Sequence, residues 1–98
     1  MYILIATDGS ISLEEADDLK RFSIIENSEA ANSSSFLAIA ESAEGDHYWI
    51  DADSVIELSP RCSDQQWVDS FWDMLGKVEA YGYSDLANKR VKAHVDHR

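Results

Sequence analysis

Residues 63–82 read Ser-Asp-Gln-Gln-Trp-Val-Asp-Ser-Phe-Trp-Asp-Met-Leu-Gly-Lys-Val-Glu-Ala-Tyr-Gly. The large apolar residues of this segment recur every three or four positions, which is the period of one helix face: Trp67, Phe71, Met74, Leu75 and Val78. Ser63 and Gln66 have the spacing of a capping box, in which each side chain satisfies a backbone amide of the other residue. Gly82 tolerates the left-handed conformation that commonly ends a helix. The segment therefore predicts a long helix over about residues 64–81.

Four segments outside this helix predict β-strands. Residues 2–7 form a continuous apolar run, which is typical of an interior strand buried on both faces. The β-branched and aromatic residues of 22–26 and 47–51 predict two further strands. Residues 90–96 alternate between apolar and polar side chains, so we interpret 89–98 either as an edge strand or as a frayed basic tail.

Shorter helices are expected between these strands. Ser12 and Glu15 have capping-box spacing, and apolar residues follow on one face, so we expect a helix over about residues 13–20. Asp51 or Asp53 is placed to cap another short helix, because an aspartate side chain accepts hydrogen bonds from the free amides of a first turn.

The segment 33–43 fits two different structures. Its serines at 33–35 could cap a helix, whereas residues 36–41 could instead form a strand that pairs with 47–50. The alanines of this segment favour the helix, because alanine has the highest helix propensity.

Together these elements predict a single α+β domain of 98 residues. We expect a small, mostly antiparallel sheet with helices packed on one face, and the helix at about 64–81 as the main packing partner. A ferredoxin-like arrangement is the nearest named fold. Such a sheet leaves its other face to water or to a second protein.

The charge of the chain is strongly negative. Nineteen acidic residues stand against eight basic ones, which gives a net charge of −11, and residues 89–98 hold four of the basic residues. Such a protein repels phosphate backbones, so we expect no nucleic-acid partner. We expect instead a protein partner with a basic surface, or a homodimer, and the simpler alternative is that the charge maintains solubility.

Three further features limit the class of protein. No apolar run approaches the length of a membrane span, and the N-terminus lacks the order of a signal peptide, so we expect a cytoplasmic protein without membrane contact. Cys62 is the single cysteine, which excludes an internal disulfide. We interpret Cys62 as a small apolar residue packed at the start of the long helix, facing Trp67.

Two short segments resemble parts of known families. Residues 3–10, Ile-Leu-Ile-Ala-Thr-Asp-Gly-Ser, resemble the opening strand and loop of universal stress proteins, but the chain lacks the glycine-rich phosphate loop of that nucleotide-binding family. Residues 48–55, Tyr-Trp-Ile-Asp-Ala-Asp-Ser-Val, resemble the haloacid-dehalogenase signature. That resemblance implies a nucleophile at Asp51 and a general acid at Asp53. The chain is too short for such a scaffold, so we interpret both aspartates as helix caps.

Aromatic residues supply the two candidate sites. The long helix carries more apolar surface than a small sheet covers, so its rings either complete the core or form a partner interface: Trp67, Phe71 and Trp72. A cleft for a small ligand is expected beside a strand end: His47, Trp49 and Asp51. His94 and His97 lack further ligands at zinc spacing, and we expect no metal, cofactor or catalytic residue.

Three classes of function remain open. The sequence favours a non-enzymatic accessory protein whose acidic surface binds a basic partner. The alternatives are an inhibitor or immunity-type protein that masks a basic enzyme, and a small-ligand-binding protein or small enzyme with a cleft near His47, Trp49 and Asp51.

Overall fold

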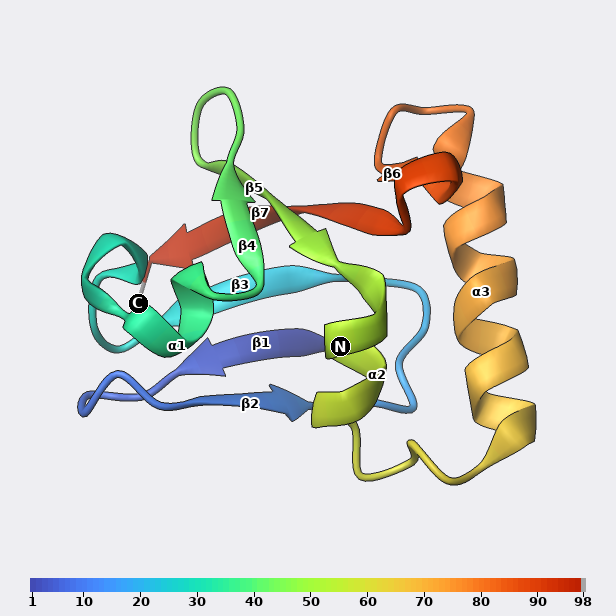
Figure 1. The fold of residues 1–98 in the computed structure, drawn as a ribbon, viewed down its shortest axis with the longest axis horizontal. Coiled ribbons are helices and arrows are strands. Elements are labelled where there is room, and N and C mark those ends of the chain that lie inside the picture. Colours follow the sequence, from blue (N-terminus) through green and yellow to red (C-terminus); the bar gives the residue numbers. More distant parts are fainter. Residues whose placement is uncertain (98) are drawn as a thin grey trace.

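Seven strands form one curled, mixed sheet in the computed structural model, which describes residues 1–97 (Figure 1). In chain order they are β1 (Tyr2–Ile5), β2 (Ile11–Glu14), β3 (Ser23–Glu26), β4 (Ala40–Ser42), β5 (His47–Asp51), β6 (Ser84–Asp85) and β7 (Arg90–His97). Across the sheet the order is β2-β1-β3-β7-β5-β4, and β6 pairs with β7. The β1–β3 and β3–β7 pairs are parallel, and the other pairs are antiparallel. The α+β class is confirmed, but the sheet is mixed and curled rather than small and mostly antiparallel, and its strand order is not ferredoxin-like.

The same residues contain three α-helices and two short 3₁₀ helices: α1 (Ser34–Leu37), α2 (Ala52–Leu58), α3 (Gln65–Glu79), η1 (Ala30–Asn32) and η2 (Leu86–Asn88). In Figure 1, α1 and α2 lie over the sheet, and α3 runs across the ends of the strands. Strands and helices share one hydrophobic core, but only α1 and α2 lie over a face of the sheet, so the expectation that the helices pack on one face with the long helix as the main partner is met only in part. The fully buried large side chains at its centre come from both kinds of element: Ile3, Ile5, Ile24, Ile50, Val91, Phe36, Val55, Phe71 and Leu75.

The predicted long helix is confirmed as α3, with a different cap. The carboxylate of Asp64, rather than the hydroxyl of Ser63, accepts hydrogen bonds from the amides of Gln66 at 3.1 Å and Trp67 at 3.3 Å. Cys62 is exposed, so its expected packing against Trp67 is wrong. Gly82 has a φ of +82° just beyond the helix, which is the left-handed conformation expected at its end.

The expected helix over 13–20 is wrong, because this segment begins as the second strand of a hairpin. Gly9 has a φ of +86° in the turn, and the Asp8 carboxylate accepts hydrogen bonds from the amide and hydroxyl of Ser10 at 2.9 and 2.7 Å. β2 then pairs antiparallel with β1, and its Leu13 lies opposite Ile3. The apolar residues of β2 thus follow the two-residue period of a strand.

The ambiguous segment 33–43 contains a short helix and a short strand. Ser33 caps α1, since its hydroxyl accepts a hydrogen bond from the amide of Phe36 at 3.2 Å. The chain then enters β4, which pairs with β5. β7 lies between β3 and β5, so residues 90–97 form a strand inside the sheet rather than the edge strand or frayed tail expected at 89–98; residue 98 lies outside the described part.

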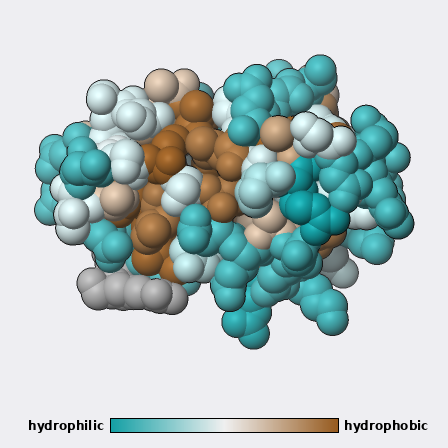
Figure 2. Space-filling model, turned by 90° about the horizontal axis from the view of Figure 1, so that it is seen from below, coloured by the Kyte–Doolittle hydropathy of each residue, from teal (hydrophilic) through white to brown (hydrophobic). Residues whose placement is uncertain are grey.

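β1 is an interior strand, as predicted, but only one of its faces is fully buried. Ile3 and Ile5 are buried in the core, whereas Tyr2 and Leu4 point to the opposite face and are only half-buried. The view from below Figure 1 shows an apolar patch left of centre, on the side where β1 and β2 lie, with hydrophilic residues around it (Figure 2).

Candidate functional site

The open face of the sheet carries the side chains that alternate with the core residues. Strand register places Leu4 beside Ile25, and Ile25 beside Asp96, so the β1, β3 and β7 part of this face has an apolar centre. On the β7 and β5 part, Trp49 lies opposite Lys92 and Asp51 lies opposite Arg90. The open face therefore has an apolar half and a half that is aromatic and charged.

The apolar half contains a cleft with an acidic rim. The cleft has a volume of about 250 Å³, and Tyr2, Ser23 and Ile25 lie on the open-face side of its lining. Ile25 is 4% exposed and Tyr2 is half-buried. Three exposed carboxylates also line the cleft, from separate parts of the chain: Glu15, Asp18 and Asp96. Its remaining lining residues are Met1, Arg21 and Phe22. We call this feature the acidic cleft.

Asp18 has structural contacts within the acidic cleft. Its backbone carbonyl accepts a hydrogen bond from the N-terminal ammonium group at 3.0 Å, and its carboxylate accepts one from the amide of Lys20 at 3.1 Å. The left-handed backbone of Glu15, with a φ of 52°, turns the chain between β2 and this segment. These contacts therefore hold Asp18 in place on the loop that follows β2.

The predicted ligand site at His47, Trp49 and Asp51 is only partly assembled. Trp49 and Asp51 line a hollow of about 390 Å³ together with Arg90. His47 is not among the residues that line this hollow, and its ring packs edge-on against His94 with 5.2 Å between ring centroids.

The carboxylate of Asp51 is engaged in capping α2. It accepts hydrogen bonds from the amide and hydroxyl of Ser54 at 3.0 and 2.7 Å. This contact agrees with the interpretation of Asp51 as a helix cap. Asp53 instead lies 4.0 Å from the ammonium group of Lys89.

Two cations pack on the ring of Trp49. The guanidinium carbon of Arg90 lies 4.5 Å from the ring centroid, and Lys92 Nζ lies 5.4 Å from it. Each cation also has a carboxylate neighbour, since Arg90 Nε lies 3.4 Å from Asp85 and Lys92 Nζ lies 3.3 Å from Glu44. The positive charge on this half of the open face is therefore largely balanced within the chain.

Two of the three aromatic residues predicted for a partner interface lie in the core. Trp67 is 4% exposed and Phe71 is fully buried, and their rings stack with 5.5 Å between centroids. Trp72 is half-buried and packs edge-on against Phe71. The alternative interpretation, that these rings complete the core, applies to Trp67 and Phe71, and an interface at Trp72 stays a prediction.

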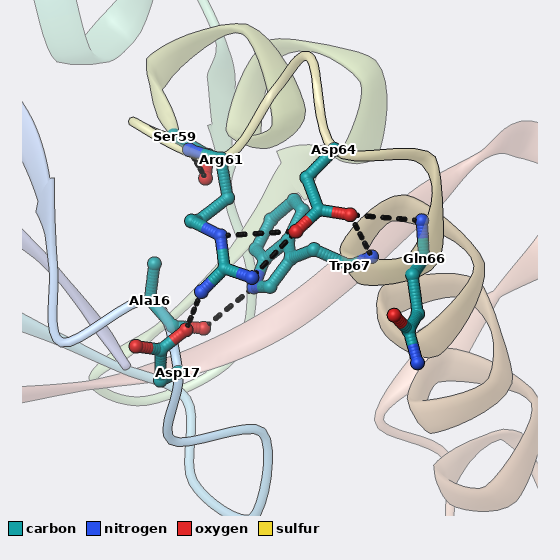
Figure 3. A network of polar contacts seen from close by, with 7 residues as sticks. All are labelled: Ala16, Asp17, Ser59, Arg61, Asp64, Gln66 and Trp67. Carbon is teal, nitrogen blue, oxygen red and sulfur yellow. Dashed lines mark hydrogen bonds and ion pairs between the residues drawn. The ribbon is translucent and has the colours of Figure 1, made fainter.

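A polar network holds Trp67 against the loop at residues 15–18, which supplies Glu15 and Asp18 to the acidic cleft (Figure 3). The indole nitrogen of Trp67 donates a hydrogen bond to the carbonyl of Ala16 at 2.7 Å. Arg61 forms ion pairs with both Asp17 and Asp64, which joins the same loop to the start of α3. Hydrogen bonding from Arg61, together with the helix-capping amides, lowers the pKa of Asp64.

Two other carboxylates with lowered pKa values also hold local structure. The hydroxyl of Ser10 donates to Asp8 in the hairpin turn and lowers the pKa of Asp8. The side-chain amide of Asn88 donates to Asp85 at 2.7 Å and lowers the pKa of Asp85. The lowered pKa values of Asp8, Asp64 and Asp85 therefore follow from hydrogen bonds within a turn or a helix cap.

Comparison with known proteins finds no matching family, and no curated protein or solved structure is significantly similar to this chain. Among the side chains that the structure describes, those of residues 1–96, no group of three or more histidine, cysteine, aspartate or glutamate residues is arranged to hold a metal ion. The side chain of His97 lies outside the described part. No helix of the described chain is long and apolar enough to cross a membrane.

The acidic cleft could not be located from the sequence. Its rim comes from the loop after β2 and from β7, and its floor comes from β1 and β3. One sequence feature pointed to it, the apolar run at 2–7. This run predicts a strand buried on both faces, whereas Tyr2 and Leu4 are only half-buried in the structure.

Proposed function

We propose that this is a non-catalytic interaction protein whose open sheet face binds a partner with a basic surface. The observation that carries the proposal is the acidic cleft, in which Tyr2 and Ile25 lie among the carboxylates of Glu15, Asp18 and Asp96. An apolar centre with a polar rim is the usual anatomy of a protein interface.

The chemistry of the cleft fits an arginine or lysine side chain of the partner. The aliphatic stem of such a residue gains by packing on the half-buried rings of Tyr2 and Phe22, while its charged head reaches the carboxylates at the rim. Hydrogen bonds between a cation and a carboxylate are stronger than those between neutral groups, and a guanidinium can make two to one carboxylate.

The charge of the whole chain supports the same class of partner. A net charge of −11 attracts a basic protein over a distance and raises the rate of encounter. An inhibitor that masks a basic enzyme is a narrower version of this proposal and would use the same cleft. The small-ligand alternative has less support, because the Asp51 carboxylate caps α2 and His47 is not part of the neighbouring hollow.

Two variants with the same net charge test the proposal. Glu15→Gln/Asp96→Asn removes two carboxylates from the cleft rim. Glu57→Gln/Asp69→Asn removes two exposed carboxylates from α2 and α3 and serves as the matched control.

The probe is a short peptide of arginine and lysine, titrated into the ¹⁵N-labelled protein at low and high salt. We expect amide shifts at Tyr2, Ile25 and Asp96, and weaker binding by the cleft variant than by the control. If the amide shifts spread over the whole acidic surface and both variants bind the peptide equally weakly, the binding is non-specific charge attraction and the proposed site in the cleft is wrong. A pull-down at low salt, repeated at high salt, then identifies the natural partner, and recovery of no partner at low salt counts against the proposal.

A further inference from the structure

The basic residues of this chain fall into two groups by their contacts. Four of those within residues 1–97 take part in ion pairs: Arg61, Lys89, Arg90 and Lys92. The other three are exposed and form no ion pair with the described residues: Lys20, Arg21 and Lys77. Among the cations of residues 1–97, these three are the ones left available to a ligand, in a chain whose net charge is −11.

All three lie along one apolar groove between α3 and the 19–22 segment. The groove consists of two hollows, of about 450 and 270 Å³, that share the lining residues Leu19, Lys20, Met74 and Val78. Lys77 borders the larger hollow and Arg21 borders the smaller one. We call this feature the α3 groove.

The walls of the α3 groove follow from the helical period. Met74 lies four residues after Ser70, and Lys77 and Val78 lie three and four residues after Met74, so these side chains share one side of α3. Leu19, Met74 and Val78 are half-buried, which leaves part of their apolar surface in contact with solvent. The smaller hollow is closed by Phe22, Tyr83 and Val91, and Tyr83 remains 49% exposed.

We propose that the α3 groove binds a single-chain amphiphile with an anionic head, of which a medium-chain fatty acid is the simplest example. The two connected hollows suit an unbranched chain, because its methylene groups gain by leaving water along the whole groove. The carboxylate is then placed beside Lys20 and Lys77, which both line the larger hollow, and Asp73 is the only acidic residue in the lining of the two hollows. Charge complementarity selects an anion here, although the rest of the surface repels one.

This inference does not depend on the proposed function. The acidic cleft and the α3 groove share Arg21 and Phe22 in their linings, but their remaining residues differ. Glu15→Gln/Asp96→Asn is therefore expected to retain binding in the α3 groove, and failure of either proposal leaves the other testable.

The two methionines of the chain allow a direct test. Met74 lines the α3 groove, whereas Met1 is 2% exposed and belongs to the core. With ¹³C-methyl methionine labelling, sodium decanoate at concentrations below micelle formation should shift the Met74 signal to saturation and leave the Met1 signal in place. Octanoate should bind about tenfold or more weakly, because each methylene transferred from water changes affinity by about fourfold.

Matched lysine variants test the charged end of the α3 groove. Lys77→Gln should weaken decanoate binding about two- to fivefold, as expected for one exposed ion pair. Lys89→Gln removes an exposed lysine that is paired with Asp53 and should leave the affinity unchanged. Circular dichroism checks that both variants are folded.

Four results would overturn the inference, the first three of which concern the methionine signals and the lysine variants. These three are the absence of a Met74 shift, equal shifts of Met1 and Met74 as in detergent unfolding, and equal weakening by Lys77→Gln and Lys89→Gln. Binding of neutral decanol as tightly as decanoate would also overturn it, since the cations would then contribute nothing.

Discussion

Replacing Trp67 with phenylalanine removes one hydrogen bond and part of one buried ring while keeping an aromatic side chain in place. The indole N–H donates to the carbonyl of Ala16 at 2.7 Å, and Trp67 is only 4% exposed. Leaving a buried acceptor unsatisfied costs about 1–3 kcal/mol. The smaller ring also leaves a void beside Phe71, which adds about 1 kcal/mol. We therefore expect Trp67→Phe to lower the free energy of unfolding by about 2–4 kcal/mol, a large part of the roughly 5–15 kcal/mol of a typical domain.

Trp72→Phe is the matched control, because it removes the same atoms from the same helix. Trp72 is half-buried, and its indole nitrogen donates no hydrogen bond within the described chain, so we expect a loss below about 1 kcal/mol. Urea unfolding followed by far-ultraviolet circular dichroism measures both, since tryptophan fluorescence changes with the substitutions themselves. The midpoint should fall with an unchanged slope. Equal losses in the two variants would refute the assignment of Trp67 as the residue that fixes α3 to the 16–18 loop.

The remaining predictions concern caps and turns. Asp51→Ala should lower the stability by about 1 kcal/mol, measured by urea unfolding, because the first turn of α2 loses its cap, and Asp51→Asn should lose less. The pKa of Asp64 is lowered in the folded state by Arg61, so its contribution is present above the unfolded pKa and is lost as the pH falls through the folded one. Below about pH 4 the stability of Asp64→Asn should therefore fall less steeply than that of the parent chain in acid titrations. Gly9→Ala should cost about 1 kcal/mol or more in urea unfolding because φ is +86°, whereas Gly76→Ala inside α3 should stabilise the chain by about 0.5–1 kcal/mol.

The elements that were predicted correctly have strong local signals. The apolar residues of α3 keep the helical period over four turns, and β5 and β3 are rich in β-branched or aromatic residues. The hairpin was missed because two local signals competed. Ser12 and Glu15 have capping-box spacing, but the turn at Asp8 and Gly9 returns the chain onto β1 before a helix can begin. The hydrogen bonds that pair β2 with β1 along its whole length stabilise the chain more than the one capping box that Ser12 and Glu15 could form.

The strand order could not be predicted because it depends on contacts between distant parts of the chain. β7 is the last strand, yet it lies between β3 and β5 and contributes Val91 and Val95 to the core. Its alternating sequence looked like that of an edge strand, because Lys92 and His94 project from the open face. An alternating sequence indicates that one face of a strand is exposed to solvent. It does not indicate whether the strand has a hydrogen-bonded neighbour on each of its two edges.

The composition of β1 connects the fold to the proposed interface. An apolar run of this kind is typical of a strand buried on both sides, yet Tyr2 and Leu4 are half-buried while Ile3 and Ile5 are fully covered. Under the proposed function, a basic side chain of the partner would pack beside Tyr2, and the carboxylates at the rim of the acidic cleft would pair with its charge. Ile3 and Ile5 pack in the core that β1 shares with the helices, and the partner would cover the open face. A basic partner surface with long aliphatic side chains would then account for both the apolar outward residues of β1 and the acidic residues around them.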